Sequence, residues 1–171
     1  MFTPPSNILL PKAYWDFAGR FPIDNRYSPE SILELKENEV FVFGANASGF
    51  HGSGSAGWAY TGKPGNQYRL GNPLLKKPKG TKGFWATLGV SRGPQVGEKG
   101  KSYAICTIVK PGLKRSISLE EIKKQVIELY LFAEKRSNLI FYVTKSGEIN
   151  KPSLSGYNLQ ENALCYLDKV P

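Results

Sequence analysis

The chain has 171 residues, of which 40% are apolar and 12% aromatic, so it is long enough to form one domain around a buried core. No apolar run approaches the roughly 18 residues of a membrane span, and prolines interrupt the first twelve residues, which argues against a secretory signal. We therefore expect one cytoplasmic domain over residues 1–171 without a membrane partner, and the net charge of +9 indicates an anionic partner.

Residues 1–28 are predicted to form an irregular arm, because four prolines there alternate with aromatic residues that can pack on the body of the domain. The next segment, SPESILELKEN at 28–38, predicts a short helix with Ser28 as its N-cap and Pro29 at its first position. EVFVFG at 39–44 then predicts a buried strand that stops at a glycine.

GANASGFHGSGSAGWAY, residues 44–60, follows that strand directly. It holds five glycines, three serines, no charged residue and the only histidine of the chain. Glycines let backbone N–H groups turn toward an anion and let a phosphate approach without meeting a Cβ. Ligands of α/β proteins bind beyond the carboxyl ends of strands, often at the start of a helix. The stretch therefore predicts a phosphate-binding loop, with a helix beginning inside SAGWAYTG.

Residues 61–82 predict a basic insert, which we expect to stand apart from any pocket. The wider region 61–115 holds twelve Lys or Arg against one acid, Glu98, a net charge of +11, whereas the remaining residues sum to −2. Two interpretations stay open. The region could bind RNA or DNA, with interleaved aromatic residues stacking on bases, or it could be a solvated loop that its charge keeps soluble.

The second half of the chain alternates predicted strands with predicted helices. Ser118 and Glu121 have the spacing of a capping box at the start of the best helix in the chain. This alternation predicts an α/β fold in one domain, with a mixed, largely parallel sheet covered by helices on both faces. Strands are predicted at 83–90, 102–109 and 139–144, a turn at 91–101, and helices at 119–136 and 158–169.

FVFGANASGFHGSGSA, followed in order by GKSYAICT, SLEEIKKQVIELYLFA, FYVT and LSGYNLQENALCYL, resembles macro domains. It is most similar to a macro-domain-like group of phage and bacterial proteins that carry FVFGSN-x-x-G-x-H-G-x-G-A-A. The resemblance spans about residues 38–168. It implies a three-layer α/β/α fold that binds ADP-ribose or a related nucleotide without a cofactor. Some members hydrolyse ADP-ribosyl bonds, so both a binding protein and a hydrolase stay open.

Carried over by position, the resemblance implies that Asn46 meets the distal ribose and that Tyr157 lies near the ribose. Asn46 and His51 are the candidate catalytic residues of a hydrolase. The implied ligand-binding residues are Gly44, Ala45, Asn46, Gly49, His51, Gly52, Ser53, Gly54 and Ser55 in the first loop, and Ser155, Gly156 and Tyr157 in the second.

Each single residue also has a structural interpretation. His51 could act as an acid or base, or it could lock the loop by hydrogen bonding to backbone across the turn. Asn46 could contact a ligand or simply form a turn. Arg92 could pair with phosphate or lie on the surface, and Trp58 could stack on a base or fill the core. Cys106 is interpreted as a buried thiol rather than a nucleophile.

Overall fold

A computed structural model describes residues 5–12, 15–16, 22, 24–29, 31–51, 54–63, 77–108 and 117–144. Gly52, Ser53, the second loop at 155–157 and the closing helix predicted at 158–169 lie outside the described residues. No helix within the described ranges is long and apolar enough to cross a membrane. The elements are β1 (Ile8–Leu9), β2 (Glu39–Asn46), α2 (Gly54–Thr61), β3 (Gly93–Val96), β4 (Lys101–Ile108), α3 (Leu119–Glu134) and β5 (Ile140–Val143).

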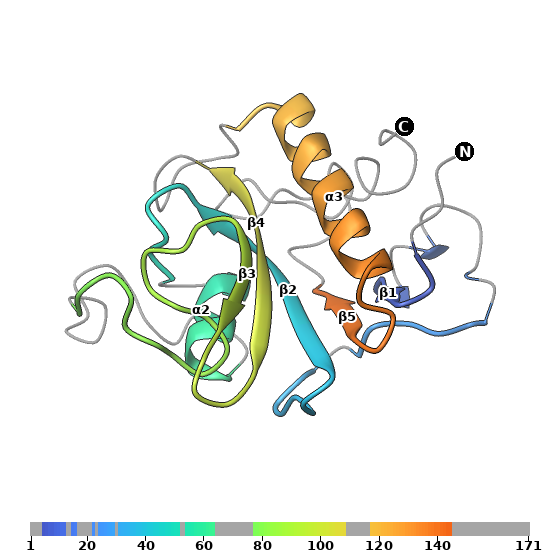
Figure 1. Cartoon of the computed structure of the whole chain (residues 1–171), viewed down its shortest axis with the longest axis horizontal. Coiled ribbons are helices and arrows are strands. Elements are labelled where there is room, and N and C mark those ends of the chain that lie inside the picture. Colours follow the sequence, from blue (N-terminus) through green and yellow to red (C-terminus); the bar gives the residue numbers. More distant parts are fainter. Residues whose placement is uncertain are drawn as a thin grey trace.

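The strands form one sheet with the order β1-β5-β2-β4-β3, so β2 lies at its centre (Figure 1). β1 pairs with β5, β5 with β2, and β2 with β4, all in parallel, whereas β3 pairs with β4 antiparallel. The fold is therefore of the α/β type with a mixed, largely parallel sheet, as predicted. The three strands expected to be neighbours, β2, β4 and β5, are adjacent.

One core cluster forms around α3. Successive side chains of a strand point to opposite faces, and Val40 and Val42 of β2 pack in this cluster with Ile122, Val126 and Leu129 of α3. The predicted N-cap is confirmed, because the Ser118 side chain accepts a hydrogen bond from the Glu121 N–H at 3.2 Å.

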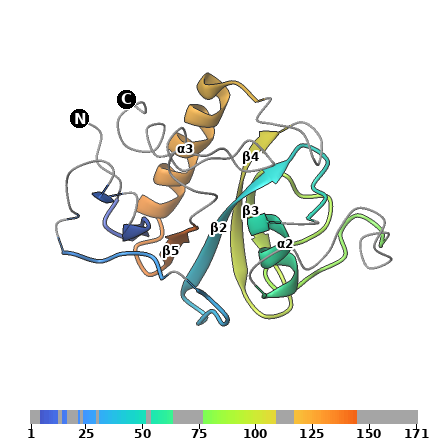
Figure 2. The ribbon, with the colours of Figure 1, turned by 180° about the vertical axis from the view of Figure 1, so that it is seen from behind.

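The alternate residues of β2 belong to a second cluster, which contains α2. Phe41 and Phe43 pack there with Trp58 and Ala59, and Trp85 joins them from the segment before β3. Figure 2 shows α2 beside β2. The Phe41 and Trp58 ring centroids lie 5.0 Å apart in an edge-on contact. Trp58 is thus a core residue.

The prediction of a short helix at 28–38 is wrong, since residues 31–36 have no regular structure and a turn follows at 37–38. Ser28 forms a bridge with Pro11, and its Oγ donates to the Val143 carbonyl at 2.8 Å. The Ile32 carbonyl accepts from Trp58 Nε1 at 2.8 Å. Long-range partners therefore use groups that a helix would have needed for its own cap and ladder.

The strand predicted at 83–90 is also wrong, and the strand of this region lies at 93–96 instead. Turns close the earlier stretch, because the Gly83 N–H donates to Ala86 O at 2.8 Å and the Leu88 N–H to Thr81 O at 3.0 Å. β3 contains Pro94, which can sit in a strand only where its nitrogen faces away from the ladder. As the last strand of the described sheet, β3 meets that condition.

Candidate functional site

The glycine loop leaves the centre of the sheet at its carboxyl end. β2 ends at Asn46 and α2 begins at Gly54, which confirms the predicted order of strand, loop and helix. The pairing with β4 shifts register there, because Ala45 pairs with Cys106 but Asn46 with Ile108. Such a bulge bends a strand and re-aims the residues that follow it.

Asn46 is buried and closes the turn that follows β2. Its Oδ1 accepts hydrogen bonds from Ser48 Oγ at 2.6 Å and from the Phe50 N–H at 3.0 Å, while Nδ2 donates to Phe50 O at 2.6 Å. The Gly49 N–H donates to the Asn46 carbonyl at 3.0 Å. This network favours the turn-forming role of Asn46.

His51 is 0% exposed and is held by backbone across the turn. Its Nε2 lies 2.9 Å from the Thr87 carbonyl, which can only accept, so we assign the ring proton to Nε2. The ring packs edge-on against Phe43, with centroids 5.4 Å apart. Burial lowers the pKa of His51 to about 4, although the hydrogen bond to Thr87 raises it. His51 is therefore neutral at pH 7, which favours the loop-locking role; acid–base catalysis stays a prediction.

Gly49 joins the loop to the segment that precedes β3. Its φ is +70°, and a Cβ built on it would lie 2.4 Å from the Gly89 carbonyl carbon. The Gly89 N–H in turn donates to the Gly49 carbonyl at 3.0 Å. Only glycine fits such a backbone-to-backbone contact, since any side chain would push the two segments apart. Gly49 therefore serves the shape of the loop, whatever ligand the loop binds.

Gln95 of β3 is a positioning residue that the sequence reasoning missed. It is 4% exposed, its Oε1 accepts from the Thr87 N–H at 2.8 Å, and its Nε2 donates to Val90 O at 2.7 Å. Gln95 thus fixes the stretch that holds His51. The sequence carried no signal for this role, because β3 buries the polar Gln95 and exposes the apolar Val96, the reverse of what their polarity predicts.

The basic insert is anchored at both of its described ends. The Phe84 and Trp85 N–H groups donate to the last turn of α2, to Tyr60 O and Ala59 O, at 2.9 Å each. At the other end, a Cβ on Gly62 would meet the Phe84 ring at 2.2 Å. Several cationic side chains near these ends are exposed and have no ion-pair partner among the residues that the structure describes: Lys63, Lys77, Lys79, Lys82 and Lys99.

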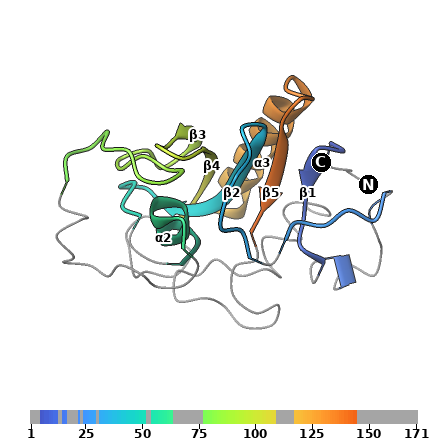
Figure 3. The same cartoon turned by 90° about the horizontal axis from the view of Figure 1, so that it is seen from below.

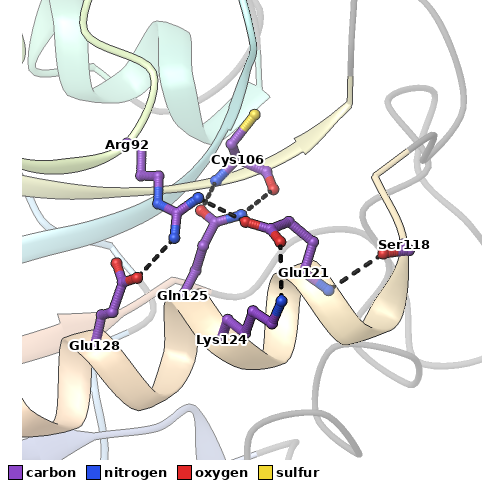
Figure 4. Close-up of polar contacts among 7 residues, drawn as sticks. All are labelled: Arg92, Cys106, Ser118, Glu121, Lys124, Gln125 and Glu128. Carbon is purple, nitrogen blue, oxygen red and sulfur yellow. Dashed lines mark hydrogen bonds and ion pairs between the residues drawn. The ribbon is translucent and has the colours of Figure 1, made fainter.

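Arg92, unlike these lysines, has ion-pair partners, and it joins the loop before β3 to α3 (Figure 4). Its two terminal nitrogens lie 2.7 Å from Glu121 Oε1 and 2.7 Å from Glu128 Oε1. Beside this pair, Gln125 accepts from the Cys106 N–H at 2.6 Å and donates to Cys106 O at 2.9 Å. The surface interpretation of Arg92 is therefore favoured, and Cys106 is buried as predicted.

An open pocket of about 600 Å³ lies at the amino end of the sheet, away from the glycine loop. Lys101 is the first residue of β4, and Leu139 comes immediately before β5. Its lining is Glu37, Asn38, Lys101, Arg136, Asn138 and Leu139. Across the described ranges, no three His, Cys, Asp or Glu side chains come together as a metal site.

The structure brings the described residues of the first predicted loop together at one end of β2. These are Gly44, Ala45, Asn46, Gly49, His51, Gly54 and Ser55. The other implied ligand residues lie outside the described ranges. Comparisons with protein-family models, with curated proteins and with solved structures return no match for this chain.

Proposed function

We propose that this chain is a macro-domain-like protein that binds a phosphate-bearing nucleotide of the ADP-ribose type at residues 44–57. The observation that carries the proposal is the position of an uncharged, glycine-rich loop between the carboxyl end of the central strand and the start of α2. Backbone N–H groups at a helix start attract phosphate, and the loop contains no carboxylate that would repel it.

The proposed arrangement is three-layered, with α2 and α3 on opposite faces of the sheet. Alternate residues of β2 support it, because Val40 and Val42 pack in the cluster of α3 while Phe41 and Phe43 pack in the cluster of α2. Figure 3, which views the sheet from below, is consistent with this arrangement. The neighbouring parallel strands β2 and β4 would then lead to helices on opposite faces, the kind of switch point where α/β sheets bind ligands.

Within this proposal, binding is favoured over hydrolysis. The Asn46 side-chain amide is hydrogen-bonded to the backbone of the turn, and the buried, neutral ring of His51 donates to Thr87 O. Both side chains would then shape the loop, and the ligand would meet backbone groups. We expect His51→Ala to retain most nucleotide affinity where the protein stays folded, whereas a hydrolase that uses His51 would lose about 10²–10⁴ in rate.

Calorimetry with ADP-ribose tests the proposal. Gly54→Val places a β-branched side chain at the start of α2, where the phosphate would lie, so it should abolish binding. Ser31→Val adds a β-branched side chain at an exposed residue outside residues 44–57, and it should bind like the wild type. Equal affinities of Gly54→Val and wild type, or no binding of any nucleotide by the wild type, would overturn the proposal.

A second candidate function is binding of RNA or DNA by the basic region. It is favoured by the exposed lysines of the insert ends, which lack ion-pair partners within the described ranges. Affinity for a polyanion should fall steeply and linearly in a plot of log K against log salt. A nucleotide seated on backbone amides should depend on salt much less, so the two candidates are separated by one titration series.

A further inference from the structure

Lys79 belongs to the basic insert, yet its side chain lies against the residue that touches the glycine loop. A Cβ built on Gly89 would meet Lys79 Cβ and Cγ at 2.9 Å and Cδ at 3.3 Å. The methylene stem of Lys79 therefore runs over the face of Gly89. Gly89 has a φ of +89° and no side chain, which leaves room for that stem.

Gly89 is in turn packed on Gly49, as described above, through the 3.0 Å hydrogen bond from its N–H to the Gly49 carbonyl. Lys79, Gly89 and Gly49 thus form three consecutive layers. Gly49 is one of the ligand-binding residues that the family resemblance implies. Only Gly89 separates the lysine stem from Gly49 of the loop.

The backbone around Lys79 is held in place on both sides. The Gly80 N–H donates to Leu88 O at 2.8 Å, and the Thr81 Oγ1 donates to Pro78 O at 2.7 Å. The turn at 78–81 is therefore tied to the residue that precedes Gly89. The exposed Lys79 side chain has no ion-pair partner in the part of the chain that the structure describes.

We infer that Lys79 supplies the positive charge that contacts the phosphates of a nucleotide bound at the glycine loop. This inference rests on the proposed function and narrows its ligand to nucleotides that carry a diphosphate or similar anion beside Gly49. Lysine suits that task because its ammonium is a compact charge on a flexible stem. The uncharged loop supplies backbone N–H groups but no cation, so a full positive charge beside the phosphates would come from a neighbouring segment.

The test compares Lys79→Met with Lys77→Met by calorimetry, using ADP-ribose and adenosine as probes. Methionine keeps an apolar stem over Gly89 and removes the charge. Lys77 is exposed in the same segment, whereas the three atoms nearest to a Cβ built on Gly89 all belong to Lys79. We expect Lys79→Met to weaken ADP-ribose binding by roughly 10–100-fold, the range for losing a hydrogen bond to a charged group. Lys77→Met should stay within about twofold of wild type, because a distant exposed charge is screened by salt.

Adenosine provides the second readout, since it lacks phosphate. Any binding of adenosine should be equal in wild type and Lys79→Met, and the melting temperatures of both proteins without ligand should agree. If wild type binds ADP-ribose but Lys79→Met binds it as tightly as Lys77→Met does, the inference is overturned while the proposed function stands. If wild type binds no nucleotide, the proposed function fails and the inference fails with it.

Discussion

The polar residues nearest the glycine loop point into the protein. The Asn46 side chain closes a turn by donating one hydrogen bond and accepting two. His51 and Gln95 both hydrogen-bond the backbone of Thr87. Residue types that indicate ligand contact in a sequence are here partly the scaffold of the loop. Burial and hydrogen-bond partners decide between the two roles, and neither can be read from composition.

The buried histidine makes stability depend on pH. The folded-state pKa of His51 is lowered to about 4 from the ordinary 6.5, so between these values the unfolded chain binds more protons than the folded one. Its contribution to stability, about 3 kcal/mol, is present above pH 6.5 and is lost as the pH falls toward 4. Urea unfolding from pH 7 to 4 should show this loss in wild type and a flatter dependence in His51→Gln. Parallel curves for the two proteins would contradict the burial of a neutral ring.

Two glycines with positive φ allow a matched comparison. Gly49 has φ +70° and a built Cβ 2.4 Å from Gly89 backbone, whereas Gly80 has φ +94° and nothing within 4 Å of a built Cβ. Gly80→Ala should cost about 1–2 kcal/mol for the left-handed conformation alone. Gly49→Ala should cost clearly more, because the segment at Gly89 must also move. Urea midpoints measure both, and equal shifts would show that the Gly49–Gly89 contact adds nothing.

At the scale of elements, a side chain of α3 hydrogen-bonds the backbone of β4 beyond the point where β3 ends. β3 pairs with β4 only up to Ala104, and Gln125 of α3 makes both hydrogen bonds to the backbone of Cys106, two residues further on. Gln125 is 1% exposed within an otherwise apolar helix face. Its amide therefore hydrogen-bonds the buried backbone of Cys106 beyond the end of the β3–β4 pairing.

Replacing Gln125 should be far more damaging than replacing its neighbour Arg92. Gln125→Leu removes two hydrogen bonds to the buried Cys106 backbone, and losing such bonds should cost about 1–3 kcal/mol for each group. Arg92→Met removes two ion pairs whose side chains are all 39% exposed or more, and such pairs contribute at most about 1 kcal/mol. Chemical unfolding at low and high salt should show a large, salt-independent loss for Gln125→Leu. A loss no larger than that of Arg92→Met would contradict the capping role.

Elements with their own periodic pattern were predictable, and elements made by distant partners were not. β2, β4 and β5 are short runs rich in apolar, β-branched and aromatic residues, and α3 carries an apolar helical repeat, so the type of each element follows from its own residues. The helix expected at 28–38 fails because Ser28 and Ile32 bond to Val143 and Trp58, far along the chain. β3 was missed because glycine and proline hide a four-residue edge strand. The loop was predicted from its glycines. Gln95 and Lys79 are connected to it only through Thr87 and Gly89, and these contacts arise from the fold.

For the whole molecule, the arrangement of the sheet joins two parts of the sequence that seemed independent. The glycine loop follows β2, while the basic insert at 61–82 begins at the end of α2 and is followed by Phe84 and Trp85, which hydrogen-bond back to α2. Hydrogen bonds at both described ends of the insert, and the glycine contact at 49 and 89, connect the regions. The methylene stem of Lys79, a residue of the insert, thereby lies one glycine away from the uncharged loop.

The proline in β3 also bears on how molecules meet one another. β3 is the outermost strand on its side of the described sheet, and an exposed strand edge invites edge-to-edge pairing between copies. Pro94 has no amide hydrogen to donate to an incoming strand. The Val96 carbonyl already accepts a hydrogen bond from Thr87 Oγ1 at 2.9 Å. Although the Val96 side chain is 53% exposed, a second chain would find one donor missing and one acceptor taken. Concentrated solutions of the folded protein should therefore resist fibre growth from this edge.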